Sequence, residues 1–410
     1  MTSANIAIDI HQSMLFDDTE FYSAAIKKQI RLLNQSINSE KSLSYILNEK
    51  GMTYDDLVYI NSNRPNLRDN HYFTIDDFKH DHHNVPVVSF FSGAGGLDLG
   101  LEAAGFSHSI LIEKNPLFCE TIKLNRPNWK INCGDVSSFD EMIKIISANI
   151  PTKTFFDGLF VGGPPCQPFS IASNQRFNKN GDNFKRVGFA HETNGNLLFE
   201  YIALIIHFRP TVFLIENVPG LIDLDNGEQL EAAYRQLENC GYHVHQPIIL
   251  KADAFSVPQQ RIRLFIIGNR IGKEFAPPQP THRSLSVGPV FVLSTHGVKN
   301  HVTREHNAES ILRYMKLNYG NRDKLGRVDR LDPLLPSKTV IAGGTGGGGR
   351  SHLHPYIPRT LSVRECARIQ TFPDDYVFTG PVARQFTQVG NAVPPILGAQ
   401  LGSAIFRSFF

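Results

Sequence analysis

Short apolar runs alternate with segments of helical periodicity along the middle of the chain. Five of these runs are rich in strand-forming residues: residues 87–91, 109–112, 158–161, 211–215 and 263–267. The segments between the first four runs repeat apolar residues at helical spacing. Strands that alternate with helices are typical of a sheet covered by helices on both faces. The pattern therefore predicts an α/β fold built on a doubly wound, mostly parallel sheet.

The N-terminal part of the chain shows a helical pattern alone. Residues 20–50 place apolar side chains at helical spacing on one face, and Gly51 follows as a stop signal. A second short helix is predicted from Thr53, whose hydroxyl can cap the backbone, with Asp55 and Asp56 near the positive end of the helix dipole. We interpret this part as a helical extension packed on the main domain. A DNA-contacting or dimerising role is the alternative.

Changes in composition suggest where domains begin and end. Residues 61–84 are polar and rich in histidine, which predicts a linker whose histidines lie in solvent. After residue 272 the alternation gives way to sequence rich in proline, glycine and histidine, typical of loops and short strands. We divide the chain into an N-terminal helical extension and linker (1–84), a main α/β domain (85–271), a second lobe (272–358) and a return segment (359–410).

Composition excludes several classes of protein. The 410 residues are enough for two or more lobes, and with a net charge of only +2 any binding of nucleic acid would depend on local basic patches. The five cysteines are scattered without metal-ligand spacing, which favours a reduced, cytoplasmic protein without a metal site. Residues 1–15 hold no long uninterrupted apolar run and no run of eighteen apolar residues occurs, so we expect neither secretion nor membrane insertion.

A glycine turn after the first predicted strand points to a nucleotide-like ligand. The strand runs into Ser92, Gly93, Ala94, Gly95 and Gly96, and a helix follows. At the end of the next strand stands Glu113, placed like the acid that binds a ribose diol. The spacing for a pyrophosphate is missing, which disfavours NAD and suits a carboxylate at the helix N-terminus. Asp135 offers a further acceptor, suited to the amino group of adenine.

The strongest chemical signal is Cys166, which follows an apolar strand and is surrounded by two glycines and three prolines. A thiol at the carboxyl edge of a sheet is favoured as a nucleophile over a packing residue. Glu216 and Asn217 follow the next strand and would reach the same edge, where a carboxyl group can act as an acid. Arg261 and Arg263 alternate along a later strand and can hold an oxygen-rich ligand on one face.

Taken together and in this order, these blocks resemble the DNA cytosine-5 methyltransferase family, of the bacterial restriction–modification type. The resemblance extends from residue 87 to the C-terminus, except for the lobe after residue 272. It implies the fold of S-adenosylmethionine-dependent methyltransferases, S-adenosylmethionine as cofactor and double-stranded DNA as substrate. Residues 272–358 would be the target-recognition domain, and residues 359–410 would return to complete the small lobe and the catalytic domain.

The same resemblance assigns residues to two sites. The cofactor pocket would comprise Phe91, Ser92, Gly93, Ala94, Gly95, Gly96, Glu113, Asp135 and Asn391. The catalytic residues would be Pro165, Cys166, Glu216, Asn217, Arg261 and Arg263.

The implied reaction is methylation of a cytosine that is flipped out of the duplex. Cys166 would attack C6, Glu216 would hold or protonate N3, and Arg263 would bind the O2 side. The loop of residues 167–196 would close over the DNA through its basic side chains: Arg176, Lys179, Lys185 and Arg186.

The alternatives are a tRNA cytosine-5 methyltransferase and a non-catalytic DNA-binding regulator on the same fold. A cognate restriction endonuclease is a possible partner, and the enzyme would associate with the bacterial nucleoid when on DNA.

Overall fold

The computed structural model describes residues 19–39, 41–61, 63–67, 71–151, 155–165, 197–281, 284–342 and 352–410. These residues form two compact units. The larger unit comprises Phe73–Leu285, Gln370–Gly380 and Asn391–Phe410, and the smaller unit comprises the residues up to Tyr72 with Ser286–Ile369 and Pro381–Gly390. The smaller unit thus combines the N-terminal extension with most of the predicted second lobe.

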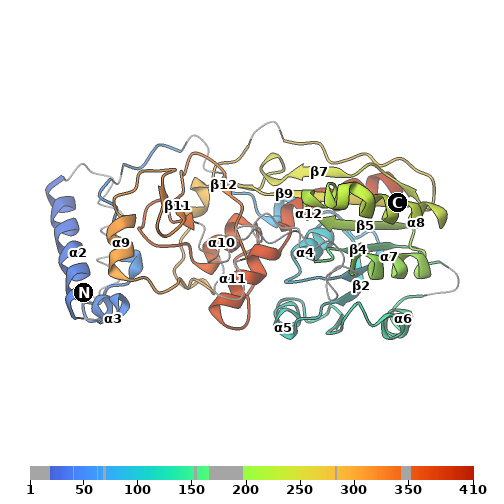
Figure 1. The fold of residues 1–410 in the computed structure, drawn as a ribbon, viewed down its shortest axis with the longest axis horizontal. Helices are drawn as coiled ribbons and strands as arrows, with labels where there is room; N and C mark the ends of the chain where they lie inside the picture. Colours follow the sequence, from blue (N-terminus) through green and yellow to red (C-terminus); the bar gives the residue numbers. More distant parts are fainter. Residues whose placement is uncertain are drawn as a thin grey trace. The chain divides into compact units, whose positions relative to one another are not determined.

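The larger unit is built on one eight-stranded sheet (Figure 1). Its strands are β1 (Pro86–Phe90), β2 (Ser107–Ile112), β3 (Ile131–Asn132), β4 (Leu159–Gly162), β5 (Val212–Asn217), β6 (His243–Val244), β7 (Ile248–Lys251) and β9 (Ile262–Asn269). They follow the order β3-β2-β1-β4-β5-β9-β6, and β7 also pairs with β9. Strands β1 to β5 are parallel, whereas β9 runs antiparallel to β5. The predicted doubly wound, mostly parallel sheet is confirmed.

Helices cover both faces of this sheet because its strands are apolar on both sides. Val88 and Phe160 point into a core shared with α6 (Phe139–Ser147), α7 (Leu197–Phe208) and α8 (Glu228–Asn239). Val87 and Leu159 point into a second core shared with α4 (Gly96–Ala103) and α12 (Pro395–Phe409). Alternate residues of each strand therefore serve opposite faces. Among the helices in the described ranges, none is both long enough and apolar enough to cross a membrane.

The register of the central strands brings their carboxyl ends to one level. Phe90 of β1 pairs with Gly162 of β4, and Gly162 pairs with Ile215 of β5. The residues that directly follow these three strands therefore emerge side by side at one edge of the sheet, where α/β proteins bind their ligands. Because β9 is antiparallel to β5, it is the beginning of β9 that reaches the same edge.

The smaller unit has a core of its own. Helices α2 (Thr19–Ser39) and α3 (Leu43–Asn48) pack with α9 (Ala308–Tyr314) around the buried side chains of Leu33, Ile46 and Ile311. Short strands β10 (Arg322–Asp323), β11 (Val328–Arg330) and β13 (His352–Leu353) and helices α10 (Val363–Ile369) and α11 (Val382–Asn391) complete the unit. This is the loop-rich lobe with short strands that the sequence predicts after residue 272.

The N-terminal extension differs from the prediction in two respects. The single helix predicted over residues 20–50 is wrong: α2 ends at Ser39, and α3 begins after Ser42, whose hydroxyl accepts the backbone N–H of Tyr45. Thr53 caps the next turn as predicted, but the turn is a 3₁₀ helix, η1 (Tyr54–Asp56). The core of the extension is shared with residues of the lobe after residue 272.

Part of the predicted linker belongs to the core of the larger unit. The 3₁₀ helix η2 (Ile75–Phe78) buries Ile75 against α4 and α12. The ring of His83 stacks on Phe406 with a centroid distance of 3.6 Å. The prediction that the histidines of this segment are solvated is therefore wrong for His83. The polar residues around Phe73, Ile75 and Phe78 masked this short apolar group in the sequence.

Candidate active site

A tight turn joins β1 to α4 at the carboxyl edge of the sheet. Phe91, Gly93 and Gly95 have φ values of 54°, 58° and 74°, in the left-handed region that glycine adopts most easily. At Gly96 a Cβ atom would lie 2.4 Å from the backbone oxygen of Val393. Only glycine lets the chain after α11 approach the turn this closely. The C-terminal segment around Val393 therefore lies against the glycine turn, on the predicted cofactor side.

Glu113 follows β2 and connects the glycine turn to the segment around Asn115. Its carboxylate accepts the backbone N–H of Gly93 at 2.8 Å and that of Asn115 at 2.7 Å. Burial raises the pKa of Glu113, although these two backbone donors act in the opposite direction. Each carboxylate oxygen still has a lone pair for another donor. A fixed carboxylate beside a glycine turn fits the two hydroxyls of a ribose.

Asp135 lies beyond the end of β3 and is partly exposed. Its side chain accepts the backbone N–H of Ser137 and forms an ion pair with Lys114 at 2.5 Å. Burial would raise the pKa of Asp135, but the bonds from Lys114 and Ser137 lower it overall. Asp135 is therefore held as a carboxylate that can accept a hydrogen bond from an amino group. The donors and acceptors around the turn fit an adenosine-containing cofactor.

The predicted catalytic residues lie at the ends of β4 and β5 and the beginning of β9, an edge that we call the catalytic edge. Nε of Arg263 lies 2.8 Å from Oε1 of Glu216, and both side chains are 16% exposed. A Cβ atom on Gly163 would lie 2.8 Å from the other carboxylate oxygen of Glu216. The proline-rich turn after β4 therefore passes directly beside the carboxylate. Pro165 is exposed, and Cys166 lies outside the described residues, as does the basic loop 167–196.

Asn217 locks the backbone at this edge. Its Nδ2 donates to the carbonyl of Pro164 at 3.4 Å, and its Oδ1 accepts the N–H of Val218 at 2.8 Å. The side chain is buried. Asn217 thus ties the segment after β5 to the turn that leads to Pro165, which keeps the carboxylate of Glu216 and the predicted nucleophile segment on one side of the sheet.

The two arginines of the alternating motif have different environments. Arg261 is fully buried, and its guanidinium donates to the carbonyl of Asn391 at 3.1 Å. Burial and the nearby charge of Arg263 lower the pKa of Arg261, although an arginine normally keeps its charge in a protein. Arg263 instead faces Glu216 and is partly accessible. Arg261 therefore holds the return segment, and Arg263 is the arginine available to a substrate.

The structure brings several of the described residues together in two groups. Gly93 and Glu113 meet at one turn, and Glu216 meets Arg263 at the catalytic edge. Sequence reasoning did not single out Lys114, whose contact with Asp135 depends on the pairing of β2 with β3.

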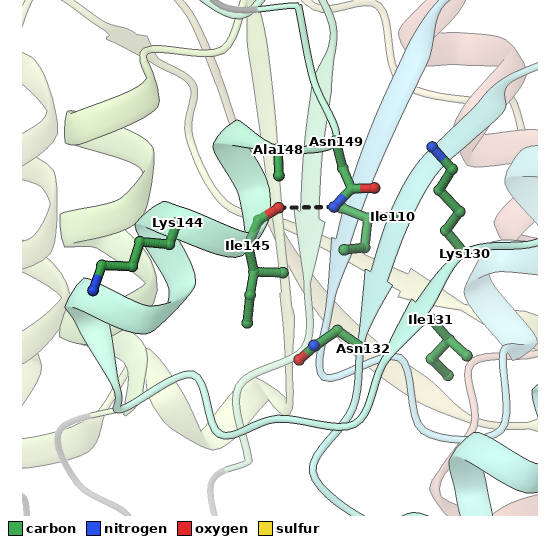
Figure 2. Close-up of a pocket in the computed structure, with 8 residues that line it drawn as sticks. All are labelled: Ile110, Lys130, Ile131, Asn132, Lys144, Ile145, Ala148 and Asn149. Carbon is green, nitrogen blue, oxygen red and sulfur yellow. Dashed lines mark hydrogen bonds between the residues drawn. The ribbon is translucent and has the colours of Figure 1, made fainter.

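A separate hollow lies between α6 and the strands β2 and β3 (Figure 2). It has a volume of about 560 Å³ and is lined by Ile110, Lys130, Ile131, Asn132, Lys144, Ile145, Ala148 and Asn149. Figure 2 shows the amino groups of Lys130 and Lys144 on opposite sides, so the two lysines do not form one anion site. None of the predicted site residues lines this hollow.

Within the described residues, one group offers three metal-ligand atoms close together: His243, His245 and Glu274. The amide of Asn269 fixes the protonation of His245. Its Oδ1 accepts the N–H groups of Ile271 and Lys273, so its Nδ2 must be the atom that faces Nε2 of His245 at 3.1 Å. Neutral His245 therefore carries its proton on Nδ1, the atom 3.7 Å from Glu274. A metal ion bound by Nδ1 of His245 together with Glu274 would need that nitrogen without its proton.

Comparison with known proteins gives a consistent result. A family model described as C-5 cytosine-specific DNA methylase matches residues 85–407. The chain is 35% identical to the Type II methyltransferase M.PspPI of Psychrobacter, over 78% of this chain and 79% of that protein. It is 32% identical to the Type II methyltransferase M.Sau96I of Staphylococcus aureus, over 97% of this chain and 92% of that protein.

A solved structure has the same fold. A DNA modification methyltransferase encoded within an Escherichia coli prophage superposes with a TM-score of 0.64 and 24% identity, over 79% of this chain and 99% of that one.

Proposed function

The chain belongs to the C-5 cytosine-specific DNA methylase family, and on this premise we propose which residues carry out the reaction. The enzyme methylates cytosine at C5 in DNA. In our proposal the target base is flipped out of the duplex, because C5 cannot be reached within the stacked helix. The base then enters the carboxyl edge of the sheet beside Glu216 and Arg263.

Catalysis proceeds through a covalent adduct of Cys166. Its thiolate attacks C6, Glu216 protonates or hydrogen-bonds N3, and Arg263 binds O2, so that electron density builds up at C5. After C5 has gained the methyl group, it loses its proton, and the bond between Cys166 and C6 breaks. The observation that carries this assignment is the contact between Glu216 and Arg263, 2.8 Å apart, next to the turn that leads into Cys166.

S-adenosylmethionine supplies the methyl group from its positively charged sulfur. The turn from Phe91 to Gly96 would hold its amino-acid end, Glu113 its ribose and Asp135 its adenine. Asn391 would complete the pocket. The support is the geometry of the turn together with the carboxylate of Glu113, which two backbone N–H groups hold in place.

The cofactor assignment is tested by Glu113→Ala. We expect S-adenosylmethionine to bind about 10- to 100-fold more weakly, since hydrogen bonds to a charged group are among the stronger ones. Isothermal calorimetry measures this, with DNA affinity as the control. An unchanged cofactor affinity would remove Glu113 from the pocket.

The covalent step is tested with DNA that carries fluorine at C5 of the target cytosine. Such a base can accept the methyl group but has no C5 proton to lose, so the enzyme remains attached. Denaturing electrophoresis should show a protein–DNA band, with the bond mapped to Cys166. Cys166→Ala should form no adduct and should still bind the duplex. Full methylation by this variant would contradict the mechanism.

The substrate and the recognition lobe need separate tests. Methyl transfer to duplex DNA but not to tRNA would distinguish the enzyme from the RNA-modifying alternative, and mapping of modified cytosines in a methylation-free host would give the site. We propose that residues 272–358 read the sequence and that a cognate restriction endonuclease cleaves the same site. Exchange of this segment with that of a relative should transfer the sequence preference.

A further inference from the structure

A closed ring of polar contacts joins three distant segments of the smaller unit; Arg359, Ser362 and Glu365 are buried in it, whereas Asp55 and His301 are partly accessible. The carboxylate of Asp55 contacts Nε2 of His301 at 2.9 Å and Nε of Arg359 at 2.5 Å. Arg359 makes two bonds to Glu365, at 2.7 and 2.8 Å. Glu365 accepts the N–H of Ser362 at 2.7 Å, and the hydroxyl of Ser362 lies 3.0 Å from Nδ1 of His301. Every member of the ring therefore contacts two others.

Asp55 is the member of this ring that lies before residues 85–407, the part matched by the family model. Arg359 and Glu365 are buried. Their charges are stable in this position only because they are paired and hydrogen-bonded. The negative charge of Asp55 thus helps to compensate the buried positive charge of Arg359.

The ring adjoins an exposed loop, residues 292–302, which is fixed at both ends. Arg364 of α10 donates to the carbonyl of Lys299 at 2.9 Å. Arg368, one turn later, donates to the carbonyls of Leu293 and Ser294 at 3.0 and 2.7 Å. Both arginines are buried. Because buried side chains hold its backbone, the loop presents its own side chains in a defined arrangement.

The side chains of this loop suit contact with a nucleic acid. Ser294, His296 and Lys299 are exposed, and Val292 is 66% exposed. Hydroxyl and imidazole groups can hydrogen-bond base edges, a lysine can contact a phosphate, and an apolar side chain can contact a thymine methyl. Residues 292–302 carry Lys299 and no acidic residue, which favours DNA over a basic partner.

We propose that residues 292–302 form a DNA-reading loop and that Asp55 of the N-terminal segment is its positioning residue, acting through His301. This inference rests on the proposed role of residues 272–358 in recognition. The N-terminal segment is then a structural part of the recognition unit. Loss of the Asp55 charge should loosen the end of the loop at His301, and the side chains that read DNA should lose their fixed positions.

The test is Asp55→Asn, compared with Asp56→Asn as a matched control. Asp56 is the next residue and caps the same turn through Thr53. For Asp55→Asn we expect the KM for cognate DNA to rise about tenfold, and the preference over a one-base variant to fall similarly, as for one lost base contact. The kcat at saturating DNA and the affinity for S-adenosylmethionine should stay unchanged. Asp56→Asn should leave DNA discrimination unchanged.

A second variant keeps the test valid if Asp55→Asn folds poorly. His301→Gln interrupts the same ring from the loop side and should reproduce the loss of discrimination. In the double variant the two effects should not add, because both interrupt one path. Additive effects, or unchanged discrimination in both single variants, would overturn the role of Asp55.

Variants of the loop itself separate this inference from the proposed function. His296→Ala and Lys299→Ala should weaken cognate binding, and Lys299→Ala should also reduce the salt dependence. If these variants alter discrimination and those of the ring do not, only the positioning role of Asp55 is wrong. If neither set has an effect but exchange of residues 272–358 still transfers preference, the reading loop lies elsewhere in that segment. If that exchange also fails, the proposed recognition domain is wrong.

Discussion

Two glutamate–arginine pairs, one in each unit, show how similar groups acquire different roles. At the catalytic edge, Glu216 and Arg263 share one contact of 2.8 Å, and both side chains are partly accessible. In the smaller unit, Glu365 and Arg359 share two bonds of 2.7 and 2.8 Å and are buried. The first pair is partly open to solvent, so a substrate can reach it. The second pair makes further contacts with Asp55, Ser362 and His354.

The difference follows from where each pair lies. Glu216 is at the end of β5, and Arg263 is at the beginning of the antiparallel β9, so they meet at the edge of a sheet. Glu365 is inside α10, where Ser362, Arg359 and His354 surround it. A pair at an edge can separate to hold a substrate. A buried pair that separates leaves an unpaired charge, which is costly.

The largest expected effect concerns the accessible pair. Glu216→Gln removes the acid that would act on N3, so we expect kcat for methyl transfer to fall about 10²- to 10⁴-fold. The midpoint of thermal unfolding should change little, because Arg263 can still be hydrated. Single-turnover kinetics with the mapped DNA site would measure the rate. A variant that unfolds more readily but keeps its kcat would reverse the roles of the two pairs.

A change in the buried pair should lower stability and leave kcat nearly unchanged. Glu365→Gln leaves Arg359 with Asp55 as its remaining carboxylate partner, so we expect the free energy of unfolding to fall by about 3 kcal/mol. Denaturant titration would measure this loss. The kcat of the folded fraction should remain close to that of the wild type. A loss below about 0.5 kcal/mol, the size of a surface substitution, would show that the ring does not stabilise the unit.

A smaller effect is expected from Gly163→Ala. The added Cβ would lie 2.8 Å from Oε2 of Glu216, so the carboxylate must move away and its contact with Arg263 must change. We expect kcat to fall about 10²-fold, since a displacement of about 1 Å can cost this much. Gly158→Ala is an unsuitable control, because its Cβ would lie 2.4 Å from a backbone oxygen of Pro86. Gly272→Ala is the control for adding a methyl group without a steric clash, because no atom lies within 4 Å of the added Cβ.

The sequence predicted the larger unit better than the smaller one, for a physical reason. Strands β1, β2, β4 and β5 have largely apolar runs, and Glu113 and Glu216 lie directly after or at the end of such a strand, so local pattern is enough to bring them to one edge. The ring around Arg359 depends on contacts between residues about 300 positions apart, such as Asp55 with Arg359. No local period encodes such a contact. Asp55 was therefore predicted only as a helix-start residue, although it pairs across the unit.

The smallest expected effect is the pH dependence of the smaller unit's stability. Burial lowers the pKa of His354 to about 3, and the bonds from Arg359 lower the pKa of Glu365 to about 2 despite its burial. In the unfolded chain the two groups have their ordinary pKa values, 6.5 for histidine and 4.5 for glutamate. The unfolded chain therefore takes up these protons at a higher pH than the folded protein does. Stability is therefore complete above pH 6.5 and decreases as the pH falls, first through His354 and then, below about 4.5, through Glu365.

The contribution of His354 between pH 6.5 and 5 is obtained by comparison with a variant, because burial also lowers the pKa of His352 in the same unit and of His245 in the larger unit. One proton changes stability by about 1.4 kcal/mol per pH unit, so we expect a loss of about 2 kcal/mol over this range. Hydrogen exchange of α9 and α10 would locate the loss in the smaller unit. His354→Asn should flatten the dependence, because an asparagine oxygen can accept the N–H groups of Tyr356 and Ile357 that Nδ1 of His354 now accepts. An equal acid sensitivity in that variant would show that another group titrates.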